Sequence, residues 1–132
     1  MKVTRKFTEA GKDVYETVQW ARRASRIANP DGSVVFEMKD AEVPSSWSQL
    51  ATDIVVSKYF RKAGVPQRDE QGNIIKDEDG KVVTGPERSV RQVVHRLAGC
   101  WRHWGEKHNY FNTTEDAQAF YDEIAYTLLH QI

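Results

Sequence analysis

The 132-residue sequence lacks several features that mark common protein classes. It has one cysteine, so no disulfide can form within the chain, and this indicates a reducing compartment such as the cytoplasm. Its 19 basic and 19 acidic residues cancel, which leaves no net charge to attract nucleic acid or an anionic membrane. No apolar run approaches the roughly 18 residues of a membrane span, and the N-terminus lacks the apolar core of a secretory signal. We therefore expect a cytoplasmic protein whose partners are neither nucleic acid nor membrane.

Apolar residues are also scarce for a compact domain, at 39% of the sequence with a mean hydropathy of −0.66. The length is typical of one domain. Residues 1–13 are polar and predict an N-terminal arm, and residues 14–132 predict a single module.

Three segments have the apolar spacing of amphipathic helices, at roughly 46–63, 87–105 and 113–131. Ser46 and Gln49 predict a capping box at the start of the first helix, and Gly64 predicts its end. The third helix is predicted to start at one of two capping pairs, Asn112 with Glu115 or Thr113 with Asp116. The second helix has an apolar face made of Val90, Val93, Val94, Leu97, Trp101 and Trp104.

Turn residues separate short β-prone runs in two places. Asn29-Pro30-Asp31-Gly32 is followed by a β-rich run and predicts a hairpin over about 17–38. A second hairpin is predicted over about 73–84, inside a polar segment, 67–85, that we expect to be variable and to protrude. The predicted fold is α+β, mainly α.

The candidates for metal or thiol chemistry are a histidine- and cysteine-containing stretch and four tryptophans. His95, Cys100, His103 and His108 lie close in sequence, but their spacing does not bring four ligands together on one helix face. We expect no metal site, and we expect Cys100 to be buried on an apolar face, where its thiol is unreactive. Trp47 and both tryptophans of the second helix are predicted to pack in the core.

Arg61, Arg88 and Arg91 come from a helix end and a helix start. Together with Lys62 and with Arg68 of the intervening loop, they could converge on an anion. The alternative is that they are solvated or form contacts at the rim of a partner surface, because no glycine-rich phosphate loop accompanies them.

Four blocks of sequence resemble the N-terminal region of adenosylcobalamin-dependent (class II) ribonucleotide reductases. The resemblance covers about residues 5–131 and is carried by NPDGSVVFE (29–37), VPSSWSQLATDIVVSKYFRKAGVP (43–66), ERSVRQVVHRLAGCWRHWGEKHNYF (87–111) and EDAQAFYDEIAYTLLHQ (115–131). Segment 67–85 resembles the family least.

The resemblance implies a non-catalytic part of a large enzyme that reduces ribonucleotides to deoxyribonucleotides for DNA synthesis. In the family, adenosylcobalamin and the catalytic cysteines act in an α/β barrel that follows the region resembled here, and Cys100 matches none of those cysteines. We therefore expect no catalytic, cofactor-binding or metal-binding residue in this chain, and no activity from it in isolation. The implied partner is the catalytic barrel of the same or a separately encoded reductase chain. The last apolar helix runs almost to Ile132, which suggests that the sequence is cut from a longer one.

Two other functions remain open at this point. The arginine set suggests a nucleotide-binding regulatory module, because reductases of this family respond to nucleoside triphosphates. The absence of a complete site suggests a free-standing interaction domain derived from the reductase.

Overall fold

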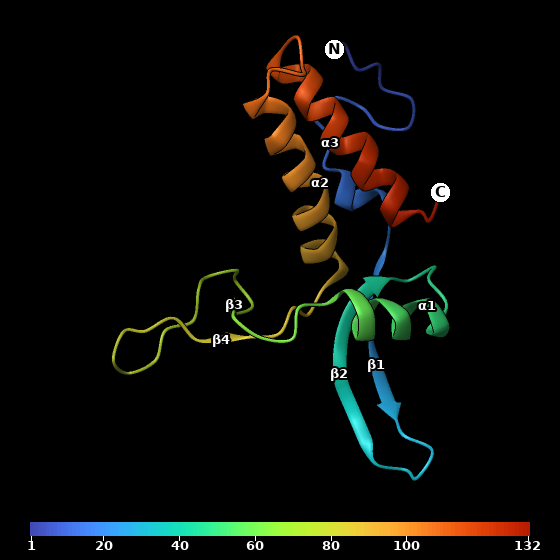
Figure 1. Ribbon diagram of the computed structural model, residues 1–132, viewed down its shortest axis with the longest axis vertical. Helices are drawn as coiled ribbons and strands as arrows, with labels where there is room; N and C mark the ends of the chain where they lie inside the picture. The colour runs from blue at the N-terminus through green and yellow to red at the C-terminus, as the bar shows by residue number, and fades with distance from the viewer.

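Two antiparallel helices stand above a long β-hairpin in the computed structural model, which describes residues 1–132 (Figure 1). The helices are α2 (Val90–Lys107) and α3 (Thr114–Leu129). The hairpin pairs β1 (Trp20–Ala28) with β2 (Val34–Pro44), and the short helix α1 (Gln49–Ile54) lies beside it. The predicted α+β class, with three helices and two small hairpins, is confirmed. No helix combines the length and the apolar character needed to cross a bilayer.

The turn of the β1–β2 hairpin forms where its residues predict. The N–H of Asn29 donates to the carbonyl of Ser33 at 2.8 Å, and the N–H of Gly32 donates to the carbonyl of Asn29 at 2.9 Å. Gly32 has φ of +89°, a left-handed conformation that a side chain would disfavour. The second strand runs on to Pro44, six residues beyond the predicted limit, because its buried end joins the core.

The first helix starts later than its sequence predicts. Ser48 is the N-cap, and its hydroxyl accepts the N–H of Ala51 at 3.0 Å. The predicted capping box of Ser46 and Gln49 is wrong, because a turn closed by the N–H of Trp47 on the carbonyl of Pro44 holds Ser46 outside the helix. The helix continues as one π-helical turn, η2 (Val55–Tyr59), so it ends four residues before the predicted limit.

The two long helices have reciprocal caps. Ser89 and Gln92 form the capping box of α2, so this helix begins after the predicted residue 87. Thr113 and Asp116 form the capping box of α3, as predicted. The N–H of Asp116 donates to the Thr113 hydroxyl at 3.1 Å.

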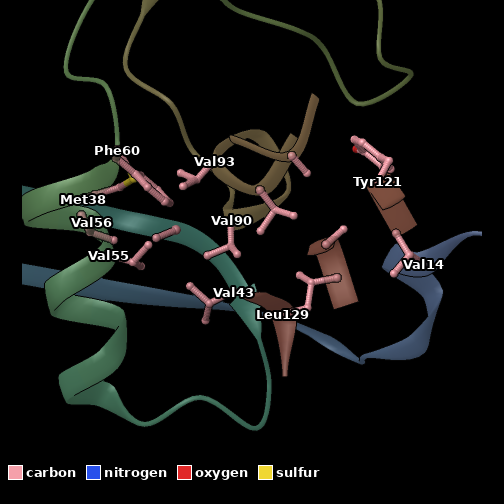
Figure 2. Packing of buried hydrophobic residues seen from close by; sticks show 14 residues of the cluster. Val14, Met38, Val43, Val55, Val56, Phe60, Val90, Val93, Tyr121 and Leu129 are labelled. Carbon is pink, nitrogen blue, oxygen red and sulfur yellow. The ribbon is translucent and has the colours of Figure 1, made fainter. Parts of the chain in front are cut away.

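A core of 14 buried residues lies where the hairpin base, η2 and the adjoining ends of α2 and α3 meet. Val43 of β2, Val56 of η2, Val90 of α2 and Leu129 of α3 are almost completely buried there (Figure 2). The 3-10 turn η1 (Val14–Thr17) closes the core from the side of α3.

The tryptophans divide between the core and the surface. Trp47 packs against the core and donates its indole N–H to the carbonyl of Leu129 at 2.8 Å. Trp101 and Trp104 are 41% and 55% exposed, so their predicted burial is wrong. Their helix continues beyond the core, where this chain covers its apolar face only in part.

Two segments extend away from this framework. Strands β3 (Val65–Pro66) and β4 (Thr84–Gly85) form the base of a narrow arm that projects to the left in Figure 1. Within the arm, the carboxylates of Asp69 and Asp77 each accept two N–H groups of the turn that follows.

Residues 1–13 form no helix or strand and lie along α3. The N–H of Val3 donates to Asp116 at 2.9 Å, and Arg5 forms an ion pair with Asp122 at 2.7 Å. Further along, the Phe7 ring stacks on Tyr126.

Candidate functional site

An apolar groove lies between α1, η2, α2 and the end of α3. It has a volume of about 380 Å³, and ten of its eleven lining residues are hydrophobic. Val55, Val90 and Val93 are buried at its floor (Figure 2), whereas Ile54 and Tyr59 are 46% and 57% exposed at its rim. We call this feature the apolar groove. It has the shape and chemistry of a site for an apolar group rather than for a charged ligand.

The apolar face predicted for the second helix forms one wall of this groove. Val90, Val93, Val94 and Leu97 line it, and the two exposed tryptophans continue the same face at helical spacing. The sequence therefore predicted the face correctly but wrongly placed Trp101 and Trp104 in the core. Scarcity of apolar residues and the resemblance to one part of a larger enzyme both pointed to some uncovered apolar surface.

A second hollow, of about 690 Å³, has no hydrophobic residue in its lining and lies between β1, β2, the arm at β3–β4 and the start of α2. Four arginines line it, Arg22, Arg68, Arg88 and Arg91, and we call it the polar hollow. Sequence reasoning named Arg68, Arg88 and Arg91 but not Arg22, which the β1–β2 hairpin brings to the same surface.

Most of these arginines already contact acceptors of this chain. Arg91 donates from Nε to Glu42 at 3.0 Å and stacks on the Trp20 ring with its guanidinium carbon 4.2 Å from the centroid. Arg88 donates to Gln67 at 2.9 Å and lies 3.4 Å from Asp40. The free anion-binding capacity of the hollow is therefore smaller than its arginine content implies.

Arg61, which the sequence suggested as a partner of Arg88 and Arg91 at an anion, does not line the polar hollow. Arg61 is exposed, and its backbone makes the contacts: its N–H donates to Glu87 at 2.8 Å, and its carbonyl accepts the Glu87 N–H at 2.8 Å. Glu87 is 3% exposed and also accepts from Arg96 at 3.0 Å. This cluster ties the two ends of the arm together, so we interpret it as structural.

A third hollow, between α2 and α3, holds a chain of hydroxyl and imidazole groups. His95 and Cys100 help to line it. The Tyr121 hydroxyl lies 2.7 Å from Nδ1 of His95 and 2.6 Å from the Tyr15 hydroxyl. Burial raises the pKa of both tyrosines, so both hydroxyls stay protonated at neutral pH.

Cys100 is exposed, and the expected burial is wrong. The helix turns this residue away from the core, toward solvent at the edge of the third hollow. No group of three histidine, cysteine or acidic side chains is arranged to hold a metal ion.

Comparison with known proteins relates nearly the whole chain to one enzyme family. Residues 21–131 match the family described as class II vitamin B12-dependent ribonucleotide reductase. The chain is similar to the vitamin B12-dependent ribonucleotide reductases of Agrobacterium fabrum and Bradyrhizobium diazoefficiens. It is 42% identical to the first over 99% of its own length and 41% identical to the second over 100%. The enzyme of that name from Rhodopirellula baltica is 39% identical over 92% of the chain.

The chain spans only a small part of these relatives. It covers 12% of the Agrobacterium and Bradyrhizobium enzymes and 10% of the Rhodopirellula enzyme. Most of each relative therefore lies outside the matched region.

Proposed function

Because the chain belongs to the class II vitamin B12-dependent ribonucleotide reductase family, we propose that it is a non-catalytic structural module of such an enzyme. In this role it packs against the catalytic part of the reductase, in the same or a separately encoded chain. Ribonucleotide reduction is then the activity of the whole assembly, in the cytoplasm. The single cysteine supports a non-catalytic role, because the chain alone has no cysteine pair to supply electrons.

The apolar groove is the observation that carries this proposal. A free-standing domain of this size has little reason to leave an apolar groove and two half-exposed tryptophans in water. In a module that packs on a larger body, the groove and the tryptophans would be covered by that body.

The residues present do not form a site for adenosylcobalamin. A pocket for a drug-sized ligand has a volume of about 300–1,000 Å³. The cobalamin is several times larger than such a ligand, and the apolar groove measures about 380 Å³. The other two hollows, of about 610 and 690 Å³, are larger than the groove but are still within the size range of a drug-sized ligand. No step of the reaction is therefore assigned to this chain.

We also propose a division into a polar arm, 1–13, and one module, 14–132, that carries a variable hairpin, 67–85. Hydrogen bonds from residues 1–13 to α3 support the view that this N-terminal arm stabilises the module. Projection of the hairpin away from the core supports its tolerance of sequence change.

A chimera tests the proposed function. The Agrobacterium fabrum reductase is prepared with its matched region replaced by this chain, and ribonucleotide reduction is measured with adenosylcobalamin and a dithiol. The chimera should be active, and the 132-residue chain alone should have no activity. A folded but inactive chimera, or turnover by the isolated chain, contradicts the proposal.

A second candidate function is nucleotide binding at the polar hollow. The observation in its favour is that guanidinium groups from four separate segments line one concave surface, including those of Arg88 and Arg91. Arg61 does not line the hollow, and its exposed side chain is proposed to contact a partner instead.

Calorimetric titration with ATP and dATP tests this candidate. Binding should weaken at least about tenfold in Arg88→Gln, because a phosphate loses a charged donor. Lys107→Gln is the matched control, since it removes a positive charge at the far end of α2. Absence of heat and of thermal stabilisation at millimolar nucleotide rules this function out.

A further inference from the structure

We propose that the apolar groove binds an apolar helix from the part of the reductase that lies outside this 132-residue segment. This inference rests on the proposed function and makes it specific, because it names the docking face and the chemistry of its occupant.

The lining of the groove selects an apolar occupant. Ten of eleven lining residues are hydrophobic, and the remaining one, Gln131, is at the exposed end of the chain. A polar or charged ligand would lose its hydration here without gaining hydrogen bonds. An aliphatic or aromatic side chain instead gains about 25 cal/mol for each Å² of apolar surface that leaves water.

An exposed strip on α2 extends the groove and gives it the length of a helix-binding surface. Leu97, Trp101 and Trp104 follow one another at spacings of three and four residues, so they lie on one face. From Val90 to Trp104 this face is about 21 Å long, at 1.5 Å per residue. A helix that places a side chain in the groove can therefore lay two or three further turns against the tryptophans.

The size of the relatives and the position of the groove point to the occupant. The matched region is 12% of the length of the Agrobacterium relative, so most of such a reductase is available to cover this face. Leu128 and Gln131 line the groove, which places the end of α3 at its edge. A reductase segment connected near this end would be held at high effective concentration over the groove.

The test compares the reactivity of one introduced cysteine in two settings, with the native Cys100 still present. Ile54→Cys places a thiol at the rim of the groove, and Val35→Cys places a matched thiol at an exposed apolar position of β2. Each substitution is made in the 132-residue chain and in the chimera described above. Rates of maleimide labelling are measured for the peptide that contains each cysteine, by mass spectrometry.

Labelling at position 54 should be at least about tenfold slower in the chimera than in the isolated chain, and labelling at position 35 should not change. Equal rates at position 54 in an active chimera overturn the groove assignment and leave the proposed function standing. An inactive chimera overturns the proposed function, and the inference falls with it.

Self-association is the competing explanation and has its own readout. If labelling at position 54 slows with rising concentration of the isolated chain, and sedimentation shows a dimer, a second copy is the occupant and the proposal is wrong. A second variant guards against misfolding: Ile54→Lys should lower the melting temperature of the chimera relative to Val35→Lys, while both isolated chains melt alike.

Discussion

Two glycines of α2 should respond in opposite ways to the same substitution. A Cβ added at Gly105 would lie 2.4 Å from Cε2 and 2.8 Å from Cζ of Phe111, closer than atoms can approach. A Cβ added at Gly99 would come no closer than 3.6 Å to any neighbour, which is ordinary contact. Both residues lie within the helix, so helix propensity favours alanine at both positions.

The expected magnitudes follow from these distances. Gly99→Ala should raise the free energy of unfolding by up to about 1 kcal/mol, the difference in helix propensity. Gly105→Ala gains the same term but must displace the Phe111 ring, which packs against Phe120 with centroids 5.2 Å apart. Overpacking of this kind costs roughly 1–3 kcal/mol, so a net loss of about 1 kcal/mol is expected.

Urea unfolding followed by tryptophan fluorescence measures both variants, because four tryptophans report on the fold. The double variant Gly105→Ala, Phe111→Leu should recover part of the loss, since the smaller side chain leaves room for the methyl group. If Gly105→Ala stabilises the chain as much as Gly99→Ala does, the close packing of the α2–α3 turn is refuted.

Three further predictions concern the buried carboxylate, the last histidine and a helix cap. Glu87→Ala should lower the free energy of unfolding by about 2–3 kcal/mol, because Arg96 and a backbone N–H lose a buried acceptor. The double variant Glu87→Ala, Arg96→Met should lose less stability than the sum of the two single variants. Additive losses in urea unfolding would contradict the pairing. Burial lowers the pKa of His130, so the unfolded chain takes up this proton at a higher pH than the folded chain. The stability that neutral His130 contributes is therefore complete above about pH 6.5 and is lost as the pH falls through the folded-state pKa. His130→Gln should reduce the change in melting temperature between pH 7.5 and 5.5, and an unchanged pH dependence would count against this assignment. Thr113→Ala should cost about 1 kcal/mol through loss of the N-cap, whereas Thr113→Ser should restore most of it, as thermal unfolding would show.

Local chemistry made much of the fold predictable. The turn at Asn29–Ser33 was predicted because a proline followed by Asp-Gly favours it strongly, whatever surrounds it. The start of α3 was predicted for the same kind of reason: Thr113 and Asp116 satisfy each other's backbone groups within one turn. The start of α1 was not, because two serines compete and the packing of Trp47 on α3 decides between them.

The sequence determined the elements, the family and the apolar faces, because spacing, turn residues and caps act over a few residues. Only the tertiary structure decided which parts of those faces are covered. Trp101, Trp104 and Cys100 lie in the second half of a helix whose apolar face is covered better in its first half, and helical spacing is the same in both halves. The tertiary structure also decided that Arg88 and Arg91 share a hollow with two arginines from β1 and the arm, while Arg61 lies elsewhere. Such groupings depend on contacts between residues far apart in the chain, and no local pattern encodes those contacts.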